Sequence, residues 1–464
     1  MSTPTTTTAP GSLPDYIASA SPNPPSNRAP WYKNTAPTYA GVFLWFAFWN
    51  SNAARGLLTG GLMPTLVGIV LAALICHFLF YVVPGLLGLK TGLPLYVVGT
   101  STFGTVGGLL MPGFLMGALQ FGWLGVNAFF SSGALSKAFG GDTGLFYTLC
   151  VIWTALAAFV GLKGIQYVAK VATYLPLIPF AVLIIALALF AGSASGFKLP
   201  VPTPTDTAGA LWSILVTVSI VVGFFATAGA AGVDFGTNSR DANDVQMGGY
   251  VGIIGAIVLT MGIAAIALAG ALASGALQVP ASNDAVDTLQ VTDALATKLS
   301  PSLYKAIMIG LTLASFPGAC FSSFIAANSF KTVMPRVNPF ISVGIGAIVS
   351  MALAITGIAG KLPVVFGIIG ASFGPICGAM VADYLLAGNR WSGPRAGFNP
   401  AGWIAWALGF FVGVMPNLHK WQEAIPDVPA APVAAFVVGF VVYYITAKIG
   451  MLTPVVPMPN RIDA

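Results

Sequence analysis

The stretch VVGFFATAGAAGVDF, residues 221–235, places three glycines and then an aspartate in a segment that is otherwise strongly apolar. An earlier apolar segment is interrupted in the same way by FWNSNAARGLLTGG, residues 48–61. Helix interruption at membrane depth is tolerated only where the freed backbone lines a cavity or the protein interior. Interrupted helices at corresponding positions of two halves indicate a transporter binding site. The alternative is that the small residues only allow close helix packing.

The composition of the whole chain agrees with a membrane protein. Of its 464 residues, 56% are hydrophobic and only 7% are charged, and it contains 55 glycines and 33 prolines. Soluble domains carry roughly 25% charged residues, so most of this protein's surface must face lipid. Glycine and proline are also commoner in membrane helices than in soluble ones.

Twelve apolar segments are long enough to cross a bilayer, which takes about 20 residues each. This predicts an all-α membrane protein in which two inverted repeats of five helices are followed by two further helices, so that the interrupted spans are the first and the sixth. Residues 1–37, rich in Ser, Thr and Pro, are expected to form a disordered cytoplasmic tail. Residues 38–453 form the transmembrane domain and residues 454–464 a second tail. The expected spans are 38–62, 64–89, 105–135, 143–162, 164–192, 208–233, 247–276, 302–328, 337–360, 362–388, 399–418 and 432–453.

The basic residues predict the orientation in the membrane. With both termini cytoplasmic, twelve of the 19 Lys and Arg residues fall in inner segments and six in outer ones, while Arg55 lies within the first span. Positive charge concentrates on the cytoplasmic side, which favours this orientation in the plasma (inner) membrane. No basic patch is interleaved with aromatic residues, so a nucleic acid partner is not expected.

Few ionisable residues lie within the spans, and each costs about 2.5–3.5 kcal/mol at a helix centre, so each is a functional candidate. His77 lies in the second span, and Asp234 and Asp383 end the sixth and tenth. The two aspartates are expected to anchor gates or loops, with proton coupling as the alternative. His77 is either a packed neutral side chain or a proton carrier, because imidazole changes charge near neutral pH.

The groups that enzymes need are scarce. The chain has two histidines and one glutamate, Glu423, and no cluster of His and carboxylates can be assembled from the sequence. Metal-dependent hydrolysis and paired-carboxylate catalysis both need such clusters. We therefore expect neither an enzyme nor a metal site, and no cofactor apart from a coupling ion, Na⁺ or H⁺.

The third span contains GALQFGWLGVNAFF, residues 117–130. Gln120, Trp123 and Asn127 are spaced by three and four residues, so they share one face of a helix. An indole offers a flat apolar surface and the glutamine amide can both donate and accept, which suits a flat polar heterocycle. The alternative is that Trp123 and Gln120 only pack against and bond to a neighbouring helix.

Four motifs together resemble nucleobase–cation symporter family 1, the purine/cytosine permease family. GALQFGWLGVNAFF is similar to the third-helix motif of that family's cytosine permeases, and GLLGLKTGLPLY to the end of their second helix. FFATAGAAGVDFGTNSRDA is similar to their sixth-helix motif and GPICGAMVADYLL to the end of their tenth. The four occur in family order over roughly residues 60–390.

The resemblance implies a leucine-transporter-like fold and a substrate site between helices one, three, six, eight and ten. By this resemblance Trp123 and Phe225 stack on the two faces of the substrate, Gln120 bonds its ring edge, and Thr227 supplies a small polar contact. The eighth helix reads GLTLASFPGACFSSF, residues 310–324. Family members often bind sodium there through a Thr-Thr pair, which aligns here with Ser315 and Phe316.

Only one helix-eight hydroxyl therefore remains for a cation. Asn50 and Asn52 in the first span are expected to supply the missing polar contacts to substrate, and Asn50 with Ser315 to the cation. The predicted function is a cation-coupled symporter that imports a nucleobase or a related flat heterocycle across the bilayer. The alternatives are an amino-acid or amine permease of the same fold and, from another class, a channel.

Overall fold

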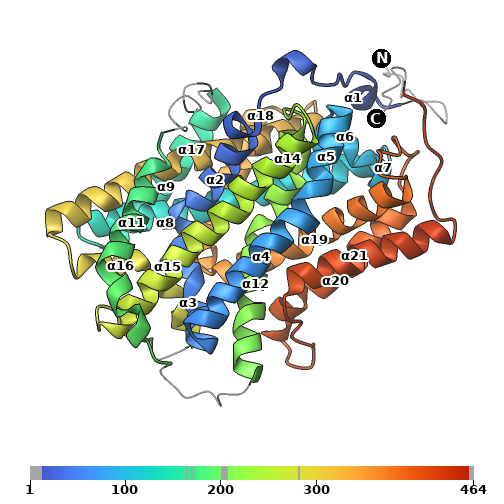
Figure 1. Cartoon of the computed structure of the whole chain (residues 1–464). Helices are drawn as coiled ribbons and strands as arrows, with labels where there is room; N and C mark the ends of the chain where they lie inside the picture. Colours follow the sequence, from blue (N-terminus) through green and yellow to red (C-terminus); the bar gives the residue numbers. More distant parts are fainter. Residues whose placement is uncertain are drawn as a thin grey trace.

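The computed structural model describes residues 13–458 except for short gaps at 164–165, 167, 169–171, 173, 200–206 and 281–282. Residues 1–12 of the predicted first tail (1–37), residues 459–464 of the predicted second tail (454–464), and part of the start of the predicted fifth span lie outside the described residues. Where the structure describes the chain, regular structure is entirely helical. Figure 1 shows the long helices packed side by side in one bundle.

The long helices of the bundle follow one another in chain order, and short helices join them. The long helices, including the six-residue π-helical stretches η3, η4 and η6 that continue them, are α2 (Thr35–Leu44), α3 (Phe46–Gly60), α4 (Leu62–Ile75), η3 (Cys76–Tyr81), α5 (Val82–Thr91), η4 (Leu109–Phe114), α8 (Leu115–Ala138), α9 (Thr143–Lys163), α11 (Leu177–Phe190), α12 (Thr207–Ala230), α14 (Ala242–Gly249), η6 (Tyr250–Gly255), α15 (Ala256–Ala273), α17 (Pro301–Val333), α18 (Pro339–Ile355), α19 (Leu362–Leu386), α20 (Pro400–His419) and α21 (Ala431–Lys448). The short elements are α1 (Asp15–Ala18), η1 (Pro25–Asn27), η2 (Trp31–Lys33), α6 (Leu95–Val98), α7 (Thr100–Phe103), η5 (Ala191–Gly196), α13 (Gly232–Gly236), η7 (Asn283–Thr288), α16 (Val291–Ala296) and η8 (Ile358–Gly360).

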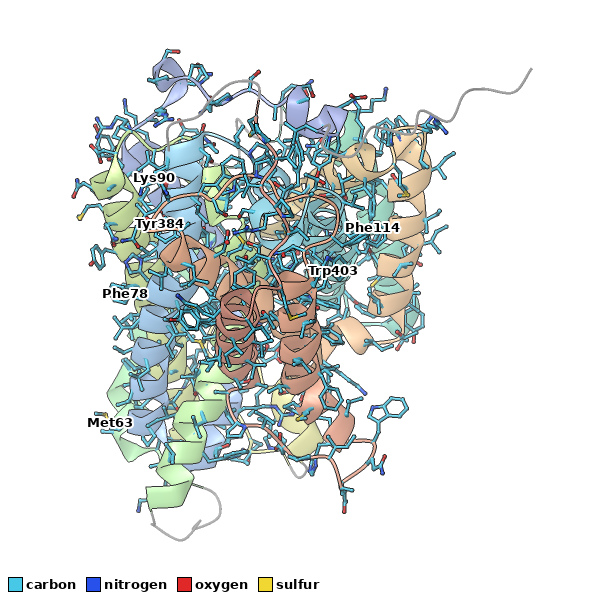
Figure 2. All side chains as sticks on the ribbon, turned by 90° about the vertical axis from the view of Figure 1, so that its right-hand side faces the viewer. Met63, Phe78, Lys90, Phe114, Tyr384 and Trp403 are labelled. Atoms are coloured by element: carbon cyan, nitrogen blue, oxygen red, sulfur yellow. The ribbon has the colours of Figure 1, made fainter. Side chains whose placement is uncertain are left out.

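Ten helical segments of the described chain are long and apolar enough to cross a membrane. The shorter apolar helix α18 and the interrupted pair α2–α3 add two more, which is consistent with the twelve predicted spans. The second of the ten segments joins η4 to α8, and the first joins α4, η3 and α5. Figure 2 shows the first running from Met63 at one end to Lys90 at the other, with Phe78 between them.

Both interruptions exist, but only one lies where the sequence predicts it. The sixth span breaks inside the predicted stretch, because α12 ends at Ala230 and α13 begins at Gly232. The first span breaks at Trp45, whose φ of −57° and ψ of 123° are not helical, and α3 is continuous through Asn50 and Asn52. The prediction of a break at those asparagines is therefore wrong.

The physical reason lies in where the side chains find partners. The Trp49 indole N–H donates to the carbonyl of Leu44, 3.0 Å away, and so satisfies a backbone group at the end of α2. Asn50 bonds to another segment and Asn52 donates to the carbonyl of Phe48 in its own helix. Because both amides are satisfied in the helical conformation, neither competes with the backbone there.

Glycines set the distance between the second span and the end of the sixth. A Cβ added at Gly88 would lie 1.9 Å from the carbonyl oxygen of Val233, and one at Gly236 would lie 2.1 Å from the carbonyl oxygen of Gly85. Neither contact is sterically allowed, so α5 and α13 can pack this closely only because both positions are glycine. This gives a physical reason for the glycines in GLLGLKTG and GVDFG.

Residues 13–37 differ from the expected disordered tail. The Asn23 N–H donates to the carbonyl of Gly92 at 2.9 Å, and the Ala29 N–H donates to the carbonyl of Asn238 at 2.8 Å. Ile17 is fully buried. This segment crosses one end of the bundle, the end at which Figure 1 also places α6 and α7. Low-complexity composition predicts disorder only where no tertiary surface binds the segment, and here one does.

Candidate functional site

The site is built on the face of α8 that carries the glutamine and tryptophan. Gln120 is 7% exposed, and its amide nitrogen lies 3.7 Å from the sulfur of Met116, a weak acceptor. Among the described residues, the Gln120 amide has no oxygen or nitrogen partner, so its donors and acceptor are available to a ligand. Its indole neighbour Trp123 is only partly buried.

Trp123 joins α8 to the interrupted sixth span. Its indole N–H donates to the hydroxyl oxygen of Thr227 at 3.2 Å. Its ring centroid lies 5.1 Å from that of Phe224, edge to face, and 5.7 Å from that of Phe366 on α19. The ring of Trp45, at the break in the first span, lies 6.1 Å away. Elements from spans one, three, six and ten therefore meet around one indole.

Phe225, the predicted second stacking residue, lies in a different environment. It is fully buried, and its ring stacks on Phe43 at 5.7 Å and contacts Tyr39 at 5.6 Å, both on α2. Consecutive residues on a helix point about 100° apart, so only one of two adjacent phenylalanines can face α8. The ring beside Trp123 is that of Phe224.

Asn50 connects the first span to the segment between α15 and α17. Its amide donates to the Thr292 hydroxyl at 3.1 Å, and its carbonyl accepts the Thr292 N–H at 3.0 Å. The same amide nitrogen lies 3.2 Å from Oε1 of Gln290, which also accepts from Lys137 at the end of α8. Asn50 thus holds a connecting segment, and these contacts favour an anchoring role over direct substrate binding.

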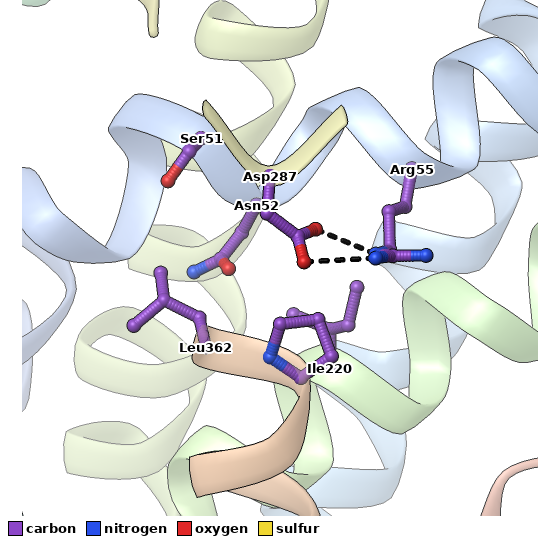
Figure 3. A pocket seen from close by; sticks show the side chains of 7 residues that line it. Ser51, Asn52, Arg55, Ile220, Asp287 and Leu362 are labelled. Atoms are coloured by element: carbon purple, nitrogen blue, oxygen red, sulfur yellow. Dashed lines mark hydrogen bonds and ion pairs between the residues drawn. The ribbon is translucent and has the colours of Figure 1, made fainter. Parts of the chain in front are cut away.

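A pocket lies beside Asn52, two residues along α3 from Asn50. Figure 3 shows its lining residues, with the Arg55 guanidinium facing the Asp287 carboxylate. The two groups form a two-bonded ion pair, with Nε–Oδ1 at 2.5 Å and Nη2–Oδ2 at 2.8 Å. Ser51 also lines the pocket, and its buried hydroxyl has no partner among the described residues. Asn52 therefore lines a pocket whose polar groups include this ion pair.

Ser315, the predicted cation ligand, is buried in α17. Its hydroxyl donates to the carbonyl of Leu311 at 3.0 Å, and its own carbonyl accepts from the Asn127 amide at 3.0 Å. Phe316 packs edge to face on Trp153 at 5.1 Å. Asn50, which was expected to contact the cation together with Ser315, lies in the continuous helix α3 and bonds to Thr292, so no helix break at Asn50 frees backbone carbonyls for a cation.

His77 and Asp234 lie apart from the aromatic group around Trp123. His77 is fully buried in η3, its Nε2 lies 3.2 Å from Oε1 of Gln246, and its Nδ1 has no partner among the described residues. Asp234 accepts the N–H of Leu95 at 2.9 Å. Asp234 therefore ties α13 to the first turn of α6, as a loop anchor does.

Asp383 is the centre of a buried polar network at the end of α19. It accepts from Arg395 at 3.2 Å, from the Tyr443 hydroxyl at 2.8 Å and from the Ser392 hydroxyl at 2.9 Å. Arg395 also donates to the carbonyl of Ser101, at 2.9 Å. The network joins α19, α21 and the segment after the second span, which favours anchoring over proton transfer.

Sequence reasoning missed three aromatic residues of this site, namely Trp45, Phe224 and Phe366. Phe224 stands next to Phe225 in the quoted motif, and helical geometry requires a choice between the two. Trp45 precedes the polar residues of the first span, and the break was predicted at those polar residues and not at Trp45. Phe366 carries no local signal, because an aromatic residue in an apolar helix is ordinarily a packing residue.

Comparison with known proteins places this geometry in context. A sequence profile of the family described as permease for cytosine/purines, uracil, thiamine, allantoin matches residues 22–439. The cytosine permease of Escherichia coli strain K12 is 23% identical over 335 residues, which are 71% of this chain and 71% of that protein.

Solved structures share the fold. Mhp1, a nucleobase-cation-symport-1 family transporter, in a closed conformation with bromovinylhydantoin bound, superposes with a TM-score of 0.64 at 17% identity, over 95% of this chain and 97% of the other. A Na⁺-coupled sialic acid symporter in a substrate-bound outward-open state superposes with a TM-score of 0.59 at 14% identity, over 96% and 93%. The predicted all-α transporter fold is confirmed.

Proposed function

Because the chain belongs to the family of permeases for cytosine/purines, uracil, thiamine and allantoin, we propose that it imports a neutral flat heterocycle, such as a nucleobase, together with a cation. It is a multi-pass membrane protein and a permease, not an enzyme. The observation that carries the proposal is the Gln120 amide, which has no strong partner among the described residues and lies about one helical turn from Trp123 on α8. The distribution of basic residues supports a plasma-membrane location with both termini cytoplasmic.

The chemistry of the site favours an uncharged ring over an amino acid or amine. The groups around Trp123 are aromatic rings, one hydroxyl and one amide. An amino acid would require partners for a carboxylate and an ammonium group, and buried charges need such partners. Aromatic faces and an amide instead match a heterocycle with donors and acceptors on its edge.

The purified protein is expected to gain thermal stability with neutral nucleobases and hydantoins, and not with amino acids or amines. A ligand that binds only the folded state stabilises it by about 2.7 kcal/mol at a hundred times its dissociation constant. The measurement is the unfolding temperature in detergent across a panel of such compounds. Stabilisation by amines or amino acids alone would contradict the proposed substrate class and support an amino-acid or amine permease.

Accumulation in proteoliposomes is expected to require an inward gradient of Na⁺ or H⁺. One charge that crosses 100 mV supplies about 2.3 kcal/mol, which is sufficient for either ion. Hard cations prefer several oxygen ligands, and Phe316 offers none beside Ser315, so sodium should activate only above the low millimolar range. The measurement is uptake under separately imposed sodium and pH gradients.

Three results of that uptake experiment separate the alternatives. Activation by low-millimolar sodium that is abolished in Ser315→Ala would restore an ordinary sodium site and contradict the expectation of weak sodium binding. Accumulation driven by a proton gradient alone would direct attention to His77, Asp234 and Asp383. Equal rates without either gradient would contradict coupling altogether.

A further inference from the structure

The break in the first span leaves one indole without a hydrogen-bond partner. At the break, the carbonyl of Leu44 is satisfied by the indole N–H of Trp49. Trp45, whose backbone forms the break, has a buried indole nitrogen with no partner among the described residues. A buried donor without a partner costs about 1–3 kcal/mol. An indole in this state in a transporter therefore needs an explanation.

Comparison with the other indoles of the described chain shows that this is unusual. Six of them donate their N–H to an oxygen, from side chains at Trp49, Trp123, Trp153, Trp391, Trp403 and Trp406, and among the described residues Trp45 has the one buried indole nitrogen without a partner. Buried polar groups in native proteins are generally paired, and an exception calls for a functional or solvent partner. The exception here lies at the one interrupted position of the first span.

The position of the Trp45 ring connects this free donor to the proposed site. Its centroid lies 6.1 Å from that of Trp123, and 6.4 Å from that of Phe224, with planes only 30° apart. The Trp123 N–H is already used by the Thr227 hydroxyl. Trp45 thus carries the indole donor of this aromatic group that remains free.

We propose that Trp45 is a specificity-determining residue whose indole N–H donates to a carbonyl oxygen or ring nitrogen on the edge of the bound heterocycle. The inference rests on the proposed function and narrows its substrate class. The site then presents a fixed donor from Trp45 and an adaptable amide from Gln120. A substrate that matches both needs an acceptor for Trp45, and a protonated amine, which has no lone pair, cannot serve there.

The position of Trp45 at the break has a further consequence. A residue outside regular helix is oriented by its ring contacts, here with Trp123 and Phe224, and not by a helical rotamer alone. The donor is therefore held by rings from α8 and α12, the elements that carry Gln120 and Thr227. A site that is built to bond a polar edge rejects analogues that lack it, because its own buried group is then left unpaired.

The test compares the parent with Trp45→Phe, which keeps an aromatic ring but removes the N–H donor together with part of the indole ring system. The probes are cytosine, uracil and hypoxanthine, each next to the analogue in which one ring carbonyl is replaced by C–H. Affinity is measured by titration of the purified protein. We expect Trp45→Phe to bind at least one carbonyl probe about tenfold more weakly, the size of one buried hydrogen bond. It should lose discrimination against the matching analogue by the same factor.

The control is Trp406→Phe, which removes the indole bond to the Ser372 carbonyl between α20 and α19 and should leave the affinities unchanged. Unchanged probe affinity in Trp45→Phe would overturn the proposal, and so would an equal loss for probe and analogue, since the ring would then act by packing. If Gln120→Leu loses affinity while Trp45→Phe does not, the proposed function stands without this inference. If the parent binds no probe, both fall.

Discussion

Arg395→Ala is expected to lower the free energy of unfolding by about 3–5 kcal/mol, because it leaves a buried carboxylate without its cation. The side chains of Arg395 and Asp383 are only 10% and 4% exposed. Arg395 also supplies hydrogen bonds to the carbonyls of Ser101 and Thr453. Removal of the guanidinium therefore disconnects three segments at one end of the bundle at once.

Thermal or denaturant unfolding of the purified protein in detergent measures this effect. The matched control is Arg390→Ala, since Arg390 is exposed and donates only to the carbonyl of Ala387 in the same loop. Such an exposed substitution should change stability by about 0.5 kcal/mol or less. Equal losses in the two arginine variants would show that the ion pair with Asp383 contributes nothing particular.

The same network allows the role of Asp383 to be tested. Tyr443→Phe removes one hydroxyl donor to the carboxylate and leaves Arg395 in place. If Asp383 is an anchor, this variant should lose stability and still show the gradient dependence of the parent. If Asp383 instead carries the coupled proton, Tyr443→Phe should change the dependence of uptake on the proton gradient.

Trp123→Ala is expected to weaken heterocycle binding by tenfold or more. Stacking of a base on an aromatic side chain is worth roughly 1–3 kcal/mol in nucleic acid sites. A heterocycle on the Trp123 indole makes the same kind of contact. The substitution also removes the bond to Thr227 and the edge contact to Phe224. Titration of the best ligand of the panel into the purified variant measures the change.

Trp123→Phe is the matched variant, because it keeps a ring for stacking, although a smaller one, and loses the bond to Thr227. It should retain most of the affinity that Trp123→Ala loses. A comparison of Phe224→Ala with Phe225→Ala then shows which phenylalanine covers the second face of the ligand. Unchanged affinity in Trp123→Ala and in both phenylalanine variants would end the stacking hypothesis.

Much of the fold follows from the hydropathy and helix propensity of neighbouring residues, which can be read from the sequence. Apolar segments of sufficient length, separated by charged loops, must become membrane helices because the bilayer offers no other partner for backbone groups. The break in the sixth span was also predictable, since Gly229 and Gly232 flank the end of α12 and glycine has a low helix propensity. The family motif that contains Gln120 and Trp123 predicted which face of α8 carries the candidate substrate site.

The rest depended on contacts between residues far apart in the chain. Asn50 looked like a helix breaker, but Thr292, distant in sequence, satisfies its amide within a regular helix. Residues 13–37 looked disordered, but Asn238 and Gly92 hold them by hydrogen bonds.

The sequence by itself therefore determined the membrane class, the all-α fold, the family motifs and the helix face that bears the candidate site. Only the tertiary structure decided that the first break lies at Trp45, that Phe224 and not Phe225 lies beside Trp123, and that Asp383 is fully bonded. The physical reason is that hydropathy and propensity are properties of neighbouring residues. The rotation of a helix and the partner of a buried polar group are set by the elements packed against it.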